Sequence, residues 1–153
     1  MLLIGLAHIT VELISLAKQF DFETIVIDPR DTFASKTNYS VPPDVLYIKW
    51  PQEILAELQP DAETYAVILS HDPKIDDPAL EILLNSKVPY IGALGSNKTH
   101  QKRIGRLKAM GFPDDQINRI HGPIGLDIRA LSAIEIALSI MAEIIQVRNT
   151  VDD

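Results

Sequence analysis

The sequence predicts a single α/β domain, in which a doubly wound and mostly parallel sheet lies between two layers of helices. Short apolar segments alternate with longer helical stretches along the 153 residues, a pattern typical of parallel strands joined by helices. The length fits one domain with a core of its own. Hydrophobic residues make up 46% of the chain and charged residues 23%, as in folded globular proteins. A disordered or fibrous chain does not fit this composition.

Five strands are expected, each short and apolar as strands buried on both faces are. They are predicted at residues 2–6, 24–28, 45–48, 65–70 and 88–94. For this connectivity the expected order across the sheet is 3-2-1-4-5.

Two helices have clear start signals. Asp77 before Pro78 predicts an N-cap followed by a proline at the first helical position. Ser132 and Glu135 have the spacing of a capping box, and an apolar stripe at helical spacing follows them. The stripe consists of Ile134, Ala137, Leu138, Met141, Ile144 and Ile145. We expect it to pack on the sheet, and its width leaves room for a second copy of the chain in a homodimer.

The domain is expected over residues 1–149, with a loose C-terminal end at residues 150–153. No internal repeat or low-complexity segment divides the chain. The segments that contain proline or glycine between the predicted elements are interpreted as loops: 42–43, 50–51, 111–113 and 122–123.

Charge and cysteine content argue against several functional classes. The chain has 14 Lys and Arg and 21 Asp and Glu, so its formal net charge of −7 opposes binding to nucleic-acid backbones. Cysteine is absent, which removes disulfides, zinc–thiolate sites and cysteine nucleophiles. No segment approaches the roughly 20 apolar residues of a membrane span, and the N-terminal residues do not resemble a signal peptide. We expect a soluble, cytoplasmic protein without a nucleic-acid or membrane partner.

The turn after the first strand has the position of the phosphate-binding turn in a Rossmann-like fold. Gly5 matches the first glycine of that fingerprint, whose glycines permit the bend, the approach of a pyrophosphate and close helix packing. Ala7 and Thr10 stand at the second and third glycine positions, with His8 between them. The alanine methyl group narrows the approach to a diphosphate.

Asp28 ends the second strand about 20 residues after Gly5, at the spacing of the acid that binds an adenosine ribose. This residue would favour NAD. Arg30 follows two residues later and would suit the 2′-phosphate of NADP, so the choice stays open. A plain polar exit from the strand explains the same residues equally well.

A second anion site is predicted after the fifth strand. Gly92, Gly95 and Ser96 belong to a glycine-containing turn that leads into a helix, whose N-terminal N–H groups and dipole attract anions. Lys98 falls in the first turn of this helix, where a cation is unfavourable unless an anion lies nearby. The basic residues further along the helix also fit a solvated helix face.

Histidines follow three of the predicted strands at the edge where ligands bind in such sheets. His8, His71 and His100 come after the first, fourth and fifth strands, and Asp72 follows His71. His71, Asp72 and His100 are therefore the candidates for proton transfer. No two histidines have the spacing of metal ligands on a helix, so no metal site is expected.

Four segments occur together in order, at residues 70–80, 90–96, 99–103 and 121–128. Together they resemble the C-terminal Rossmann domain of the XdhC/CoxI family, accessory proteins of xanthine dehydrogenase and related molybdenum hydroxylases. The resemblance covers nearly the whole chain and implies a domain that handles the molybdenum cofactor before its insertion into such an enzyme. Family members usually carry a preceding domain with a cysteine motif. This sequence has no cysteine, so no thiolate contact with molybdenum carries over.

The leading hypothesis is a domain that binds a nucleotide or the phosphate-bearing molybdenum pterin cofactor and assists maturation of a molybdenum hydroxylase. Gly5, Ala7 and His8 would form the first phosphate turn, with Asp28 on a ribose. The second anion site would use Gly92, Gly95, Ser96 and Lys98. The polar groups around the recognised end would be His71, Asp72, His100 and Asp127.

Two other classes stay open from the residues alone. One is an NAD(P)-dependent oxidoreductase that uses His71 or His100 for proton transfer. The other is a non-catalytic nucleotide-binding or interaction module, which the missing glycine, the missing cysteine and the wide C-terminal stripe would suit. The candidate cofactors are accordingly NAD(P) and the molybdenum cofactor.

Overall fold

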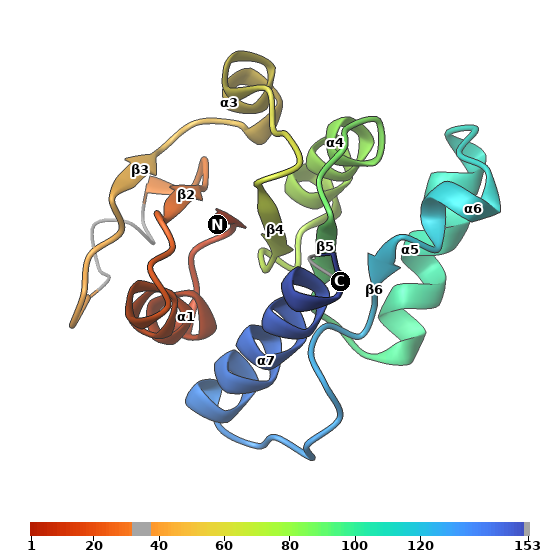
Figure 1. The fold of residues 1–153 in the computed structure, drawn as a ribbon. Coiled ribbons are helices and arrows are strands. Elements are labelled where there is room, and N and C mark those ends of the chain that lie inside the picture. The colour runs from red at the N-terminus through yellow and green to blue at the C-terminus, as the bar shows by residue number, and fades with distance from the viewer. Residues whose placement is uncertain (32–37, 152–153) are drawn as a thin grey trace.

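A computed structural model describes residues 1–31 and 38–151 of the chain. Within this part, six parallel strands form one sheet in the order β3-β2-β1-β4-β5-β6 (Figure 1). The strands are β1 (Leu2–Ile4), β2 (Ile25–Ile27), β3 (Val45–Tyr47), β4 (Tyr65–Ile68), β5 (Tyr90–Ala93) and β6 (Ile120–His121). The predicted fold class and the order of the five predicted strands are confirmed. The edge strand β6 was not predicted.

Helices cover both faces of the sheet (Figure 1). They are α1 (His8–Gln19), α3 (Pro51–Leu58), α4 (Pro73–Leu84), α5 (Asn97–Ala109), α6 (Asp114–Ile117) and α7 (Ala133–Val151). Helices α1 and α7 pack together on one face, and α3, α4 and α5 lie on the other. None of the described helices combines the length and apolarity that crossing a membrane demands.

The sheet separates two hydrophobic cores, because successive side chains of a strand point to opposite faces. Leu3 and Val67 are buried on the face covered by α1 and α7. Ile4 and Ile68, their neighbours along β1 and β4, are buried on the face covered by α3, α4 and α5. Burial of each such side chain contributes about 1.5–3 kcal/mol. The central strands are therefore fixed in position and register, which holds the turns at their carboxyl ends in place.

The predicted start of a helix at Asp77 is wrong, because α4 begins four residues earlier. Asp72 is the N-cap, its Oδ1 accepts a hydrogen bond from Lys74 N at 3.0 Å, and Pro73 takes the first helical position. The pair Asp72-Pro73 thus carries the same cap signal as Asp77-Pro78. Pro78 lies inside the helix and removes one hydrogen bond, to the carbonyl of the exposed Lys74.

Residues 50–51 were also interpreted as a loop, and Pro51 instead begins α3 with Trp50 as the N-cap. Proline at the first helical position loses no hydrogen bond, so the residue that interrupts the preceding segment also starts this helix.

The capping box before α7 is confirmed. Ser132 Oγ donates to Glu135 Oε1 at 2.8 Å and accepts from Glu135 N at 3.2 Å. The helix continues to Val151, past the expected domain end at residue 149, and residues 152–153 lie outside the described part. Of the predicted stripe, Ala137, Met141 and Ile144 are buried and Ile145 is half-buried. Ile134 and Leu138 are exposed by 53% and 52%, because the first turns of α7 extend beyond the sheet.

Candidate functional site

A hollow of about 550 Å³ opens at the carboxyl ends of the strands. Its walls are the turn after β5, including Gly95 and Asn97, and residues 123–130, which lead from β6 toward α7. This volume lies within the roughly 300–1,000 Å³ of small-molecule sites. A second hollow of about 780 Å³ lies at the opposite ends of the strands, lined by residues 59–62 and 85–87 among others, away from every predicted site residue. We therefore place the candidate site at the carboxyl edge of the sheet.

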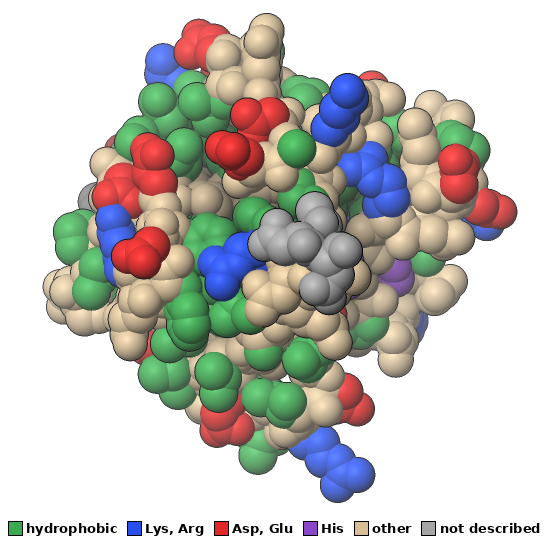
Figure 2. All heavy atoms as spheres, in the orientation of Figure 1, with side chains coloured by type: hydrophobic (Ala, Val, Ile, Leu, Met, Phe, Trp, Pro, Cys, Tyr) green, Lys and Arg blue, Asp and Glu red, His purple; other side chains and the backbone are tan. Residues whose placement is uncertain are grey.

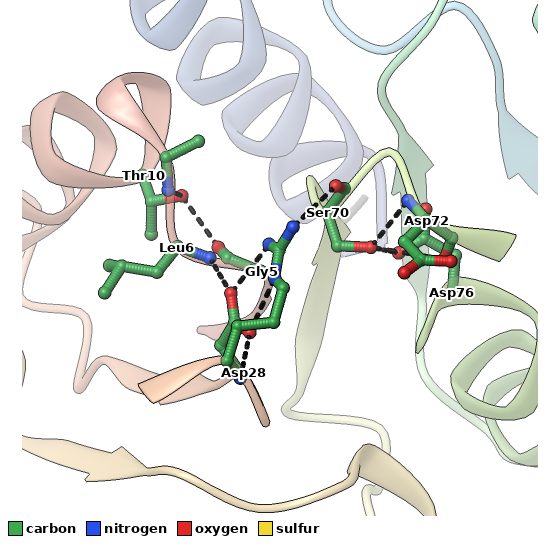
Figure 3. A network of polar contacts seen from close by, with 9 residues as sticks. Gly5, Leu6, Thr10, Asp28, Ser70, Asp72 and Asp76 are labelled. Carbon is green, nitrogen blue, oxygen red and sulfur yellow. Dashed lines mark hydrogen bonds and ion pairs between the residues drawn. The ribbon is translucent and has the colours of Figure 1, made fainter. Parts of the chain in front are cut away.

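The β1–α1 turn is closed by contacts within the protein (Figure 3). Gly5 has φ +103°, and a Cβ there would lie 2.5 Å from Ser70 N, so the turn requires glycine. Gly5 N donates to a β2 carbonyl at 2.9 Å, and Ala7 N donates to Thr10 Oγ1 at 3.0 Å. Thr10 Oγ1 in turn donates to Gly5 O at 2.8 Å. Thr10 thus replaces the third glycine of the fingerprint with a side chain that occupies the turn's own polar groups.

Asp28 also ties this turn to the end of β2 (Figure 3). Its Oδ2 accepts from Leu6 N at 2.7 Å and from Arg30 Nη2 at 2.8 Å. Its Oδ1 accepts from Arg30 N at 2.9 Å and from Arg30 Nε at 3.0 Å. Four hydrogen bonds fill the acceptor sites of a carboxylate. The Asp28 side chain is 1% exposed and that of Arg30 is 28% exposed, so Arg30 is the charged group that faces solvent here.

A buried polar group follows β4 and reaches α4 (Figure 3). Ser70 Oγ donates a short hydrogen bond to Asp76 Oδ1 and accepts from Asp72 N at 3.1 Å. Asp76 is buried on the sheet side of α4. Burial raises the pKa of Asp76 to about 6, although the Ser70 hydrogen bond and the charge of Arg103 act in the opposite direction.

Arg103 and His100 of α5 extend this buried group toward β5. Arg103 Nη2 donates to Leu94 O at 2.9 Å, and Nη1 lies 3.3 Å from His100 Nδ1. Burial lowers the pKa of Arg103 and also that of His100, to which the charge of Arg103 adds. The four side chains of Ser70, Asp76, His100 and Arg103 therefore place buried titratable groups directly behind the carboxyl edge.

A second buried network is centred on Glu143 of α7. Its Oε1 accepts from Tyr90 OH at 2.6 Å and from Gly125 N at 3.1 Å, and His121 Nδ1 lies 3.4 Å away. Burial tends to raise the pKa of Glu143, but the hydrogen bonds from His121, Tyr90 and Gly125 outweigh it and hold the pKa below its usual value. Because Gly125 lines the hollow, Glu143 fixes one of its walls.

The predicted residues around the β4 and β5 ends take different places. His71 is exposed with φ +63°, a strained conformation for a non-glycine residue. Asp72 and Ser96 are the N-caps of α4 and α5. His100 is buried beneath Gly122, where an added Cβ would lie 2.3 Å from its Nδ1.

The other predicted residues are spread along the same edge. His8 is exposed at the start of α1, and Lys98 is exposed in the first turn of α5. Gly95, with φ +138°, and Asp127 line the hollow. Gly92 lies within β5, where an added Cβ would lie 2.5 Å from Ile124 Cδ1, so its lack of a side chain serves packing.

Sequence reasoning did not single out Asp76 or Glu143, and it treated Arg103 only as one of several basic helix residues. All three are charged residues at positions whose helical spacing puts them on a buried face. A charged residue within an apolar helical stripe was the available signal.

The charge distribution gives no extended anion-binding surface on the face in Figure 2, where basic and acidic side chains are interspersed. Within the described ranges, 1–31 and 38–151, no three His, Asp or Glu side chains are grouped so that they could hold a metal ion.

Comparisons with known proteins agree on one family. The family model described as the XdhC Rossmann domain matches residues 1–144. The chain is 36% identical over 93 residues to the "Molybdenum cofactor insertion chaperone PaoD" of Escherichia coli (strain K12), covering 61% of this chain and 29% of that protein. It is 32% identical over 152 residues to a protein of Bacillus subtilis (strain 168) named as a probable xanthine dehydrogenase component, covering 99% and 43%.

A solved structure has the same fold. The crystal structure of a xanthine dehydrogenase from Bacillus halodurans matches with a TM-score of 0.81 and 28% identity, covering 97% of this chain and 42% of that one. The chain thus spans less than half the length of each of these three proteins.

Proposed function

The chain belongs to the XdhC Rossmann-domain family, and we propose that it binds the molybdenum pterin cofactor at the carboxyl edge of its sheet and assists insertion of the cofactor into a molybdenum hydroxylase. It resembles accessory proteins and insertion chaperones of this kind. The observation that carries the proposal is the hollow of about 550 Å³ at the position where ligands bind in such sheets.

The residues around the hollow suit an anionic, hydrogen-bonding ligand. The N-terminus of α5 lies at the hollow through Gly95 and Asn97, and its dipole favours negative charge. Gly95 keeps this approach open, because a Cβ at φ +138° would lie 2.8 Å from Thr99 Cγ2. Residues 123–130 add backbone polar groups and the Asp127 carboxylate for the edge of a heterocycle.

The donor set suits the organic part of the cofactor better than its metal. The sequence offers no thiolate, and the described residues hold no cluster of metal ligands. We infer that the cofactor is held as cargo through its pterin and phosphate and that molybdenum itself receives no ligand from these residues.

An NAD(P)-dependent oxidoreductase has less support. The first-turn amides of Gly5, Leu6 and Ala7 already donate within the protein, so they do not cradle a diphosphate without rearrangement. His100, one of the two proton-transfer candidates, is buried under Gly122.

Retention of the cofactor tests the proposal. The chain is mixed with molybdenum cofactor released from a molybdenum hydroxylase and passed through a desalting column. Molybdenum and the fluorescent oxidised pterin are then measured in the protein fraction, and the loaded protein is tested for activation of the cofactor-free hydroxylase. We expect pterin and molybdenum to be retained and transferred. Absence of pterin from the protein fraction would refute the proposal.

Lys98→Ala should weaken cofactor binding about tenfold, the equivalent of about 1.4 kcal/mol for one charge-assisted contact. The side chain is exposed, so the midpoint of thermal unfolding should not change. Lys87→Ala is the matched control, because this exposed lysine lies at the opposite hollow. Equal affinities of the two variants would remove Lys98 from the site.

An exposed apolar strip, defined as Ile128, Leu131, Ile134 and Leu138, lies beside the hollow and is proposed to contact the molybdenum hydroxylase. Leu131 is 90% exposed, which is unusual for a leucine without a partner. Leu131→Glu should abolish a complex with the purified hydroxylase on gel filtration and leave thermal stability unchanged. Met110→Glu, at an exposed apolar residue after α5, should bind normally. A wild-type homodimer that Leu131→Glu converts to monomer would assign the strip to self-association instead.

A further inference from the structure

We propose that Arg30 is the ligand-contacting residue at the end of β2, and that it selects a ligand with a phosphate monoester over one with an unmodified ribose. The inference rests on the proposed function, because it specifies which chemical group the same edge of the sheet recognises. It also reassigns Asp28, which the sequence placed on a ribose, as the residue that positions Arg30.

The first step is the state of the Asp28 carboxylate. Recognition of a ribose requires a carboxylate oxygen that can accept from the sugar hydroxyls. Both oxygens of Asp28 already accept two hydrogen bonds each, from Leu6 N and from three groups of Arg30. With 1% of its side chain exposed, Asp28 cannot reach a ribose unless this arrangement breaks.

The second step is the orientation of the Arg30 guanidinium. The bidentate contact through Nε and Nη2 holds the planar group against Asp28, and Nη1 lies 3.4 Å from Ser70 O (Figure 3). The guanidinium therefore spans the gap between the end of β2 and the end of β4, across the β1–α1 turn. Its 28% exposure lies on the side that a ligand would approach.

The third step is the chemistry that such a group recognises. A fixed guanidinium binds the oxygens of a phosphate monoester strongly, because that group is compact and carries close to two negative charges. A ribose diol offers no charge, and the diphosphate of a dinucleotide finds the turn amides occupied and the Ala7 methyl in place of glycine. A terminal phosphate is thus favoured over both. Its source is either the 2′-phosphate of a nucleotide or the phosphate of a pterin cofactor.

The experiment measures binding of two ligand pairs to the unmodified chain by calorimetry at low salt. The pairs differ by one phosphate each: NADP⁺ with NAD⁺, and molybdopterin with its enzymatically dephosphorylated form. We expect the phosphorylated member to bind at least about tenfold more tightly wherever a pair binds.

The outcomes separate this inference from the proposed function. Preference for the phosphorylated pterin supports both. Preference for NADP⁺ with no pterin binding supports Arg30 selection and refutes the pterin cofactor. Pterin binding that ignores the phosphate, or NAD⁺ binding at least as tight as NADP⁺, overturns the inference, and binding of none of the four ligands overturns both.

A double variant tests the residue itself. Asp28→Asn combined with Arg30→Gln removes both charges together and so avoids leaving one buried charge unpaired. We expect it to lose the discrimination within each pair, whereas Lys87→Ala at the opposite end of the strands keeps it. Discrimination that persists in the folded double variant would exclude Arg30. If circular dichroism shows that the double variant is unfolded, the ligand pairs on the unmodified chain decide the question.

Discussion

Glu143→Ala is expected to lower the free energy of unfolding by about 3–5 kcal/mol, the range for removing one member of a buried charged network. The substitution leaves the hydroxyl of the fully buried Tyr90 and the amide of Gly125 without their acceptor. Urea denaturation at neutral pH measures the change. Gln146→Ala, an exposed position on the same helix, should stay within about 0.5 kcal/mol of the unmodified chain.

A double-mutant cycle distinguishes the network from simple loss of packing. Tyr90→Phe alone should cost about 1 kcal/mol, because it removes one hydrogen bond to Glu143. In the Glu143→Ala background the same change should be neutral or stabilising, since the hydroxyl then has no acceptor there. Additive costs within about 0.5 kcal/mol would show that the two side chains act independently.

The consequence for the site is a second expected result of the same variant. Glu143 holds Gly125 in the wall of the hollow and lies beside His121, which stacks on the Tyr90 ring with centroids 4.7 Å apart. Residues 123–130 are therefore positioned by α7, although they follow β6 in the chain. Cofactor binding should weaken in Glu143→Ala even under conditions where the variant is folded.

The fold was largely predictable because its signals are local. Buried parallel strands are continuous apolar runs, and the order of five of them follows from connection rules that hold for nearly all such sheets. The strands end earlier than predicted, because Leu6, Asp28 and Ser70 already belong to the turns at the carboxyl edge. The two-residue strand β6 has no run of its own and exists through its pairing with β5.

The site was predictable only where one residue suffices. Gly5 and Gly95 have the positive φ angles that the turns require, and Ser96 caps α5. The partners of charged residues were not predictable, because they come from distant segments. Glu143 meets Tyr90 across the β5–α7 packing, and Asp28 is occupied by its own neighbour Arg30, a competition that spacing alone does not reveal.

Asp76→Asn is expected to stabilise the chain by about 3 kcal/mol at pH 7.5 and to have little effect at pH 4. Burial raises the pKa of Asp76 from 3.8 to about 6. As pH rises between these values, the unfolded chain loses the Asp76 proton while the folded chain keeps it, so stability falls. Above about pH 6 the folded chain carries the full cost of a buried carboxylate, and asparagine removes that cost because it accepts the Ser70 hydrogen bond without a charge.

Urea denaturation of both proteins from pH 4 to pH 7.5 measures this difference, with Asp115→Asn as an exposed control that should show no such trend. A pH-independent difference, or destabilisation at pH 7.5, would refute the assignment. A residue that costs stability persists where function requires it. Asp76 faces the charge of Arg103 behind the carboxyl edge and holds Ser70, whose backbone packs against Gly5. The more stable Asp76→Asn variant should therefore bind the cofactor more weakly than the unmodified chain at pH 7.5.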